Sequence, residues 1–475
     1  FSIEGNKDEV AQYFKNFTGI AHQYGMKVSG DCNTKFLEKM GADESNLSIF
    51  NEMGIDSIRM DLCYFDERDT KLINNAYNIG VEMSAAFIKP IDESIARGAN
   101  IDNLVCCHNF YPERYTGADL ESVMNVNNHW KEKGVKGFRF DVVNVISKPE
   151  VYEDDHEGDG RRFYTDGHHV HEFLKELVRD TGIEDMITVG EMSSTSLDNC
   201  IRYSNPEEKE LSMCFNFHHL KVDYKNGNKW ELMDTNRKEL KRLFEEWQIG
   251  MQEHNGWNSL FWCNHDQPRI VSRMGNEGTY WKQSAKMLAA AVHLMRGTPY
   301  IYQGEEIGMP NAHFKDINDY RDVESLNYYE ILLKEGKTKE EAIKTLQERS
   351  RDNSRTPMQW SDEKNAGFSD VIPWISLPDH YKEINVENEL RDEDSIYYFY
   401  KKLIELRKEK EVIQEGTIEF FEKDDDDLLA YERNYKEEHL VVFNNLTEKE
   451  KEVEIPQLWT SYHKLIGNYD TENMK

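Results

Sequence analysis

Apolar and polar positions along residues 48–191 follow one repeating pattern. A stretch with helical spacing of its apolar residues ends at a glycine, and a short, nearly continuous apolar run follows. Five such runs occupy residues 57–62, 81–85, 104–108, 137–142 and 186–191. Glycine commonly ends a helix, and continuous apolar strands are typical of parallel sheets covered by helices. The pattern therefore predicts an α/β fold with parallel strands, arranged either as a barrel or as a doubly wound sheet.

The pattern changes towards the C-terminus. Residues 309–390 are rich in Asp, Asn, Tyr and Lys and are predicted to form a long, mostly helical insertion, with a further helix at 396–408. Four short apolar runs follow at residues 416–421, 428–433, 439–444 and 452–455. They predict a small C-terminal antiparallel β-domain. The acidic residues 424–427 are predicted to form a solvated hairpin turn, with a cation site as the alternative.

Polar side chains stand at the carboxyl ends of the predicted strands. These residues are Asp61, His108, Asp141, Glu191 and Asp266. The chemistry of a (β/α)8 barrel is carried out at that end of its strands, so the placement favours a barrel over a doubly wound sheet. A single Asp at a strand end is more often the N-cap of the next helix, and the combination carries more weight than any one residue.

Asp141, Glu191 and Asp266 are candidates for cleaving a glycosidic bond. A retaining mechanism needs two carboxyl groups about 5–5.5 Å apart, one as nucleophile and one as proton donor. The donor must hold its proton near neutral pH, which burial or a neighbouring negative charge achieves. Arg139 lies two residues before Asp141, so in a strand both side chains face the same side, and a cation there would keep Asp141 ionised.

Four motifs resemble the α-amylase superfamily of glycoside hydrolases. They are GFRFDVVN at 137–144, TVGEMS at 188–193, WCNHDQPR at 262–269 and GTPYIYQGEE at 297–306, and they match its fourth, fifth, seventh and eighth barrel strands in order. RDNSRTPMQW at 351–360 resembles the substrate loop of the oligo-1,6-glucosidase branch. Residues 158–167 and 211–224 are most similar to trehalose-6-phosphate hydrolases. The resemblance begins near residue 120 and runs nearly to the end of the chain.

The resemblance implies a retaining α-glucosidase that hydrolyses trehalose 6-phosphate to glucose and glucose 6-phosphate, with isomaltose-like sugars as the alternative substrates. Asp141 would be the nucleophile, Glu191 the general acid/base and Asp266 the stabiliser of the distorted sugar. Arg139 and His265 would support them. The implied chemistry needs no cofactor and no metal.

Two further roles concern substrate binding. By the same resemblance, Arg355 would contact substrate hydroxyls. The phosphate needs cations at its end of the cleft, and Lys221 with His218 or His219 is the predicted set. The alternative reading of the same residues is a surface lysine beside a packed pair of histidines.

Residues 1 to about 119 resemble a different family, the 6-phospho-N-acetylmuramidases. The resemblance rests on VSGD at 28–31 and on residues 46–61 and 99–112. The α-amylase family's third-strand motif Asp-x-x-x-Asn-His has no counterpart, so an inactive fusion with at most weak sugar-phosphate binding is the alternative function. A helix near residues 119–133, with Trp130 on its apolar face, is predicted to join the two parts.

The expected architecture is an incomplete or composite (β/α)8 TIM-type barrel with the small C-terminal antiparallel β-domain. Its predicted parts are residues 1–119, a partial barrel; residues 120–411, the partial catalytic barrel; and residues 412–475, a shortened β-domain.

The net charge of the chain limits the kinds of binding partner that we expect. A formal net charge of −31 repels nucleic acid and anionic membranes, which leaves a small sugar phosphate as the expected partner. The sequence has no apolar run of about 18 residues, which predicts no transmembrane helix, and its first residues lack the pattern of a signal peptide. The seven cysteines form no CxxC pair and are predicted to be buried, reduced thiols of a cytoplasmic protein.

Overall fold

The structure is a computed structural model. It describes residues 6–24, 28–32, 40–41, 48–60, 80–84, 104–107, 127–128, 130–132, 134–149, 151, 153–158, 160–453, 459 and 461–469. The strand-end candidates Asp61 and His108 lie outside these residues. The chain forms two compact units. Unit 1 comprises Phe1–Lys136 and Val145–Met186, and unit 2 comprises Gly137–Asn144 and Ile187–Lys475.

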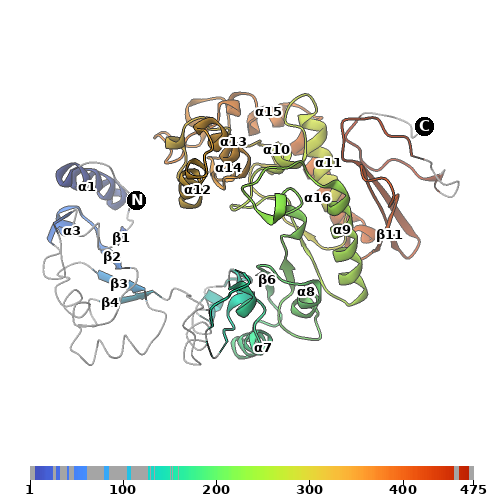
Figure 1. Cartoon of the computed structure of the whole chain (residues 1–475), viewed down its shortest axis with the longest axis horizontal. Helices are drawn as coiled ribbons and strands as arrows, with labels where there is room; N and C mark the ends of the chain where they lie inside the picture. Colours follow the sequence, from blue (N-terminus) through green and yellow to red (C-terminus); the bar gives the residue numbers. More distant parts are fainter. Residues whose placement is uncertain are drawn as a thin grey trace. The chain divides into compact units, whose positions relative to one another are not determined.

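The N-terminal part of unit 1 contains a four-stranded parallel sheet whose spatial order follows the sequence (Figure 1). Its strands are β1 (Ser29–Cys32), β2 (Ser57–Met60), β3 (Gly80–Ser84) and β4 (Leu104–Cys107). Helix α1 (Lys7–Gln23) begins at Asn6, whose side chain accepts hydrogen bonds from two backbone amides of the first turn. Its Thr18 hydroxyl donates to the carbonyl of Met53, just after α3 (Ser48–Glu52), at 2.6 Å. The predicted parallel strands are confirmed here.

Helix α7 (Val170–Thr181), also in unit 1, buries an apolar face that includes Leu174 and Leu177. It ends at Gly182, which has a positive φ of 59°. The Lys131 ammonium donates to the carbonyl of Gly182 at 2.9 Å, so the last turn keeps a partner. Residues 130–132 are helical, as predicted. Asn127, which the same helical spacing places on the predicted face, is buried, whereas Trp130 on that face is half exposed.

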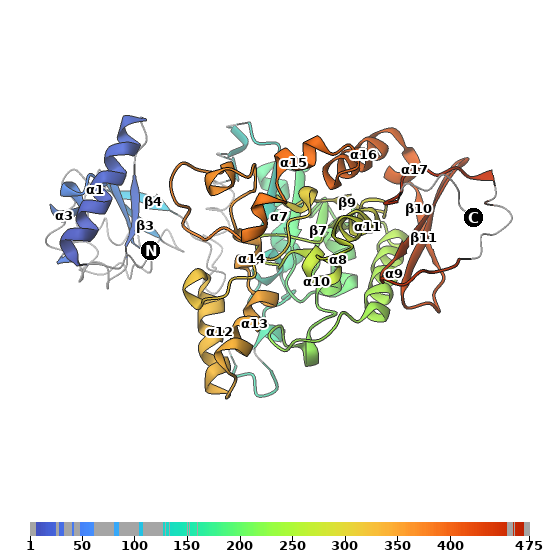
Figure 2. The same cartoon turned by 90° about the horizontal axis from the view of Figure 1, so that it is seen from above.

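Unit 2 contains five parallel strands, ordered as in the sequence. Figure 2 shows this unit from above. They are β5 (Gly137–Phe140), β6 (Ile187–Glu191), β7 (Met213–Phe215), β8 (Ser259–Leu260) and β9 (Thr298–Pro299). Strands β5, β6 and β7 form one sheet and β8 and β9 another, and a parallel bridge between Cys214 and Asn258 connects the two. In the part of the chain that the structure describes, the hydrogen-bonded strands form open sheets, and no sheet closes into a barrel.

The helices of unit 2 include those of the predicted insertion. They are α8 (Leu197–Ser204), α9 (Arg237–Glu253), α10 (Ile270–Met274), α11 (Trp281–His293), α12 (Val323–Lys334), α13 (Lys339–Arg349), α14 (Asp352–Arg355), α15 (Val386–Arg391), α16 (Ile396–Glu409) and α17 (Glu411–Gln414). The insertion is less helical than predicted, because residues 356–385 form only short 3-10 turns. Three prolines, Pro357, Pro373 and Pro378, interrupt this stretch, and proline is poorly tolerated inside a helix.

The C-terminal residues form the predicted antiparallel sheet, with strands β10 (Thr417–Phe421), β11 (Leu428–Tyr435) and β12 (Glu438–Asn445). The predicted fourth strand is not formed at residues 451–453, and residues 454–458 lie outside the described part. The buried Arg433 of β11 donates to the carbonyls of Gly416 and Leu294, each at 2.7 Å. Because Leu294 directly follows α11, the Arg433 side chain links the C-terminal sheet to the end of that helix.

The acidic residues 424–427 form the predicted turn between β10 and β11. Asp425 and Asp427 both pair with Lys451, at 2.9 and 3.1 Å. These contacts describe a turn held by ion pairs.

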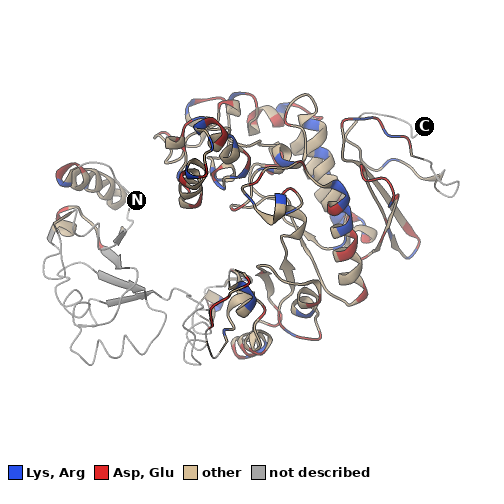
Figure 3. Cartoon of the chain, in the orientation of Figure 1, with Lys and Arg blue, Asp and Glu red and all other residues tan. Residues whose placement is uncertain are grey.

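Acidic and basic side chains alternate along the described helices, for example on α9, so the negative charge is spread rather than gathered on one helix (Figure 3).

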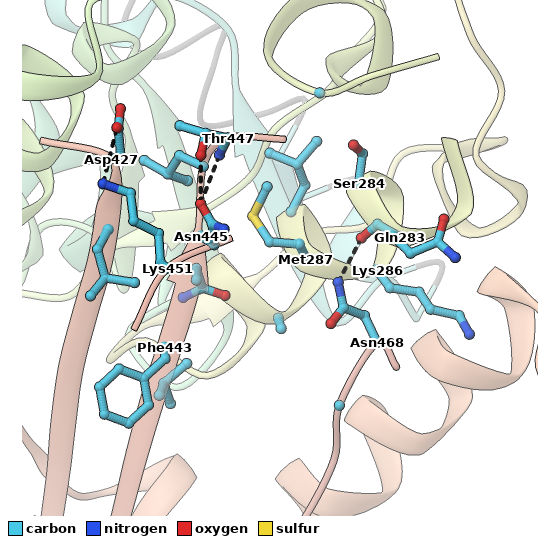
Figure 4. A pocket seen from close by; sticks show the side chains of 18 of the residues that line it. Gln283, Ser284, Lys286, Met287, Asp427, Phe443, Asn445, Thr447, Lys451 and Asn468 are labelled. Atoms are coloured by element: carbon cyan, nitrogen blue, oxygen red, sulfur yellow. Dashed lines mark hydrogen bonds and ion pairs between the residues drawn. The ribbon is translucent and has the colours of Figure 1, made fainter. Parts of the chain in front are cut away.

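A cavity of about 1930 Å³ lies beside α10 and α11 and the segment that follows β12 (Figure 4). The Asn468 side chain donates across it to the carbonyl of Gln283 at 3.0 Å. None of the three candidate acids lines this cavity. Among the described residues, none of the helices combines the length and the apolar character that crossing a bilayer requires.

Three cysteines whose surroundings the structure describes, Cys200, Cys214 and Cys263, are buried and form no disulfide, as predicted.

Candidate active site

The register of β5 against β6 brings two of the predicted acids together. The two strands pair in parallel from Gly137 with Ile187 to Phe140 with Gly190. Extending this register by one residue places Asp141 beside Glu191. Neighbouring strands are about 4.8 Å apart, and residues in register point to the same face of a sheet. Asp141 and Glu191 therefore lie at the carboxyl ends of two adjacent strands.

Arg139 contacts both of these acids. One of its terminal nitrogens pairs with Asp141 and the other with Glu191. The arginine is two residues before Asp141, so both side chains lie on the same face of β5, as the sequence predicted. The Asp141 side chain is 72% exposed and that of Glu191 only 15% exposed. The pair thus has one open and one enclosed carboxyl group, joined by a single cation.

Asp266, the third predicted acid, follows β8. Because β5, β6 and β8 are parallel, its loop leaves the sheets at the same edge as the other two acids. Its carboxylate accepts hydrogen bonds from Arg355 at 2.6 Å and Arg351 at 3.3 Å, and the His265 ring lies 3.3 Å away. Arg355 also donates to the His265 carbonyl at 2.7 Å. The predicted residues 265, 266 and 355 therefore form one hydrogen-bonded group.

A second carboxylate, that of Asp322, contacts the same two arginines that hold Asp266. Arg351 donates to it at 2.6 Å, and Arg355 lies 3.6 Å from it. Asp322 and Arg351 were not among the predicted site residues. Arg351 is the first residue of the RDNSRTPMQW motif, so that motif held the signal for it. Asp322 lies in the insertion, where no strand-end pattern marks it.

Asn144 is a further residue that the sequence reasoning missed. Its side-chain amide donates to the carbonyl of Ser193 at 2.8 Å and accepts from the Ser193 amide at 2.8 Å. It stands three residues after Asp141, and Ser193 stands two residues after Glu191. Its position at the end of the GFRFDVVN motif was visible in the sequence, but its partner was not.

The predicted phosphate ligands occupy different surroundings. His219 is buried, and its ring packs near Phe244, Phe261 and Trp262. Its Nε2 lies 2.9 Å from the Phe261 carbonyl oxygen, and burial lowers its pKa to about 4. His219 is therefore neutral near pH 7, and the packed alternative describes it better than the phosphate alternative. Lys221 is exposed.

The neighbouring His218 is also enclosed. Its ring is tilted against Trp247, with centroids 4.8 Å apart, and burial lowers its pKa. No group of His, Cys, Asp or Glu side chains within the described part of the chain has an arrangement suited to a metal ion. The chemistry that the site can perform from these residues is acid–base and nucleophilic chemistry by carboxyl groups.

Comparisons with protein families match two parts of the chain. Residues 118–416 match the family described as alpha amylase, catalytic domain. Residues 1–147 match the family described as 6-phospho-N-acetylmuramidase, N-terminal. Both resemblances expected from the sequence motifs are thereby confirmed.

Curated relatives are similar over most of the chain. The trehalose-6-phosphate hydrolase of Bacillus subtilis (strain 168) is 52% identical over 335 residues, which are 70% of this chain and 60% of the relative. The enzyme of that name from Escherichia coli (strain K12) is 50% identical over 373 residues, 76% of this chain and 67% of the relative. The chain thus spans about 60 to 67% of the length of these relatives. An oligo-1,6-glucosidase of Bacillus cereus is 43% identical over 74% of the chain and 65% of the relative.

Among solved structures, the crystal structure of Bacillus licheniformis trehalose-6-phosphate hydrolase superimposes with a TM-score of 0.73 at 40% identity. The superposition covers 94% of this chain and 96% of that one.

Proposed function

The chain belongs to the α-amylase family and shares its TIM-barrel fold, and from this premise we propose that it is a retaining α-glucosidase acting on trehalose 6-phosphate. The products would be glucose and glucose 6-phosphate. The substrate is suggested by the names of the relatives from Bacillus subtilis and Escherichia coli. The observation that carries the proposal is the placement of Asp141 beside Glu191 with Arg139 against both.

In the proposed first step, a carboxylate oxygen of Asp141 attacks the anomeric carbon of the glucosyl unit. Glu191 gives its proton to the glycosidic oxygen, so the bond to glucose 6-phosphate breaks without release of a charged alkoxide. The glucosyl unit is left esterified to Asp141. In the second step Glu191 takes a proton from water, and the resulting hydroxide releases glucose with the original anomeric configuration.

The contact between Arg139 and Glu191 bears on this assignment. A neighbouring cation favours the ionised form of a carboxyl group, whereas the proton donor must be protonated. Glu191 therefore acts as the donor only after the glycosidic oxygen has taken the place of Arg139 beside it. Asp141, which must be ionised to attack, also contacts Arg139.

Asp266 and its partners have supporting roles in the proposal. Asp266 binds sugar hydroxyls and stabilises the positive charge that develops on the ring in the transition state. Arg355 and Arg351 hold its carboxylate, and His265 stands next to the same group. For the phosphate we retain Lys221 as the proposed cation and assign no charge to His219.

The proposal is tested by release of glucose from trehalose 6-phosphate by the full 475-residue chain. Asp141→Ala should lower kcat/KM by at least about 1000-fold, because it removes the nucleophile. Asp424→Ala, the same change in the exposed β10–β11 turn, is the matched control and should match the parent. No hydrolysis by the parent, or equal hydrolysis by Asp141→Ala, would contradict the proposal.

A second comparison tests the phosphate ligand. Lys221→Ala should raise KM for trehalose 6-phosphate about tenfold, since a hydrogen bond to a charged group contributes about 1.5–3 kcal/mol. KM for 4-nitrophenyl α-glucoside, which has no phosphate, should not change. Lys238→Ala on the exposed face of α9 serves as the control. An equal change of KM for both substrates would rule out Lys221 as the phosphate ligand.

A further inference from the structure

The side chain of Asn144 ties together the two loops that carry the acid pair. Its Nδ2 donates to the Ser193 carbonyl and its Oδ1 accepts from the Ser193 amide, each at 2.8 Å. Asn144 is fully buried, with 0% of its surface exposed. Two hydrogen bonds between one amide group and one residue's backbone fix both distance and direction, which a single bond does not.

These bonds replace the strand ladder where it ends. The last ladder pair of β5 and β6 is Phe140 with Gly190, and the acids stand immediately beyond it. Both loops then leave the extended conformation, since Val142 has a φ of 41° and Ser194 a φ of 51°. The Asn144–Ser193 pair is therefore the described hydrogen-bonded link between the loops on the far side of the acids.

Val142 shows that this region is held against a local preference. A positive φ is unusual for a β-branched residue, and a sparsely populated backbone conformation costs about 1–3 kcal/mol. Such a conformation persists only where its surroundings over-determine it. Asp141 precedes Val142, and Asn144 follows it by two residues. Val143 packs close to Gly190, where a Cβ would lie 3.2 Å from the Val143 side chain.

We infer that Asn144 is a positioning residue that sets the separation between the carboxyl groups of Asp141 and Glu191. It acts through the Ser193 backbone and touches neither acid in the described contacts. The inference rests on the proposed function, because that separation matters through the retaining mechanism. A shift of about 1 Å in a reacting group can cost on the order of 100-fold in rate.

The test uses two variants of the full chain. Asn144→Asp is nearly isosteric and keeps an acceptor for the Ser193 amide, but it places an oxygen against the Ser193 carbonyl. Asn144→Ala removes both bonds. The control is Asn385→Ala, since Asn385 is equally buried, donates to the carbonyls of Tyr381 and Lys382 at 2.9 and 3.3 Å, and caps α15.

The readout compares two leaving groups. Trehalose 6-phosphate needs a proton on its leaving oxygen, whereas 4-nitrophenol leaves readily without one. Both Asn144 variants should lower kcat by about 10- to 100-fold with KM within about threefold. The factor by which kcat falls should be at least threefold larger for trehalose 6-phosphate than for 4-nitrophenyl α-glucoside. A purely structural role would lower kcat for both substrates by the same factor, as expected for Asn385→Ala. That outcome would overturn the inference.

Failure of the proposed function gives a different result. If the parent cleaves the nitrophenyl glucoside but not trehalose 6-phosphate, the substrate is wrong, and isomaltose takes its place in the same comparison. If the parent cleaves neither, the proposed function fails. Crystal structures of the parent and Asn144→Asp then decide the inference. A wider separation of the two carboxyl groups in the variant would support it, and an unchanged separation would overturn it.

Discussion

Asp322 lies behind Asp266, and the two carboxylates share the same two arginines. Arg351 donates to Asp322 at 2.6 Å and to Asp266 at 3.3 Å, while Arg355 donates to Asp266 at 2.6 Å. The Asp322 side chain is only 2% exposed. Burial alone would raise its pKa, but the hydrogen bond and charge of Arg351 outweigh burial, and the pKa lies below its usual value. Asp322 is thus an ionised, buried anchor for the arginines that hold Asp266.

Replacing this anchor should affect both stability and activity. Asp322→Asn leaves the two arginines with the carboxylates of Asp266 and Glu324 only. Breaking a buried ion pair costs about 3–5 kcal/mol in the free energy of unfolding. We expect about 3 kcal/mol by denaturant unfolding, because Arg351 is 30% exposed. We expect kcat/KM to fall at least about tenfold, since Asp266 loses its fixed orientation. Asp319→Asn is the control, because Asp319 accepts only from Ser376 among the described side chains. Equal stability of the two variants would contradict this role.

The C-terminal sheet should depend on Arg433. This buried side chain donates to backbone carbonyls of Gly416, Thr417 and Leu294. Arg433→Met keeps much of the volume but leaves these carbonyls without their donor, and each buried unsatisfied group costs about 1–3 kcal/mol. Thermal unfolding should show a lower Tm, with faster hydrogen exchange in β10 and β11. Arg391→Met, at an exposed ion pair with Glu387, should stay within about 0.5 kcal/mol of the parent. Unchanged exchange in the sheet would show that Arg433 is dispensable.

Buried histidines predict a loss of stability in mild acid. Burial lowers the pKa of His219 to about 4, from an ordinary value of 6.5. Between these values the unfolded chain binds a proton that the folded chain does not. The free energy of unfolding should therefore fall as the pH drops from 6.5 to 4, by about 3 kcal/mol for this residue.

Urea unfolding at a series of pH values measures this loss. His219→Gln, which keeps a donor for the Phe261 carbonyl, should flatten the dependence between pH 6.5 and 4. Part of the slope should remain, because burial also lowers the pKa of His293 to about 3 and that of His380 to about 4. His439→Gln, at an exposed position on β12, should leave the slope unchanged. An unaltered slope in His219→Gln would mean that the ring titrates normally.

The sequence predicted the parts of the fold that local patterns determine. Strands β2 to β6, helix α16 and the C-terminal sheet appear close to their predicted positions, because glycine stops and continuous apolar runs are local signals. The second half of the insertion differs, since Asp- and Asn-rich segments with several prolines suit turns as readily as helices. The fourth C-terminal strand was predicted from four residues, of which the described ones are irregular.

At the site, the sequence located the acids but not their arrangement. That Asp141 stands beside Glu191 depends on a strand register between residues 50 positions apart, which no local pattern contains. The same limit explains why Asn144 was missed, since its partner is the backbone of Ser193. It also explains why the burial of His219 was not predicted, since the rings that pack near it, those of Phe244 and Trp262, are distant in sequence.

The division of the chain into units has a consequence for how this protein can vary. Between Asp141 and Glu191 the chain leaves unit 2 for residues 145–186 and then comes back. The two acids are aligned by the pairing of β5 with β6, so their register does not depend on the number of residues in the intervening segment. One residue inserted between Gly137 and Asp141 would instead turn the Asp141 side chain to the other face of the sheet.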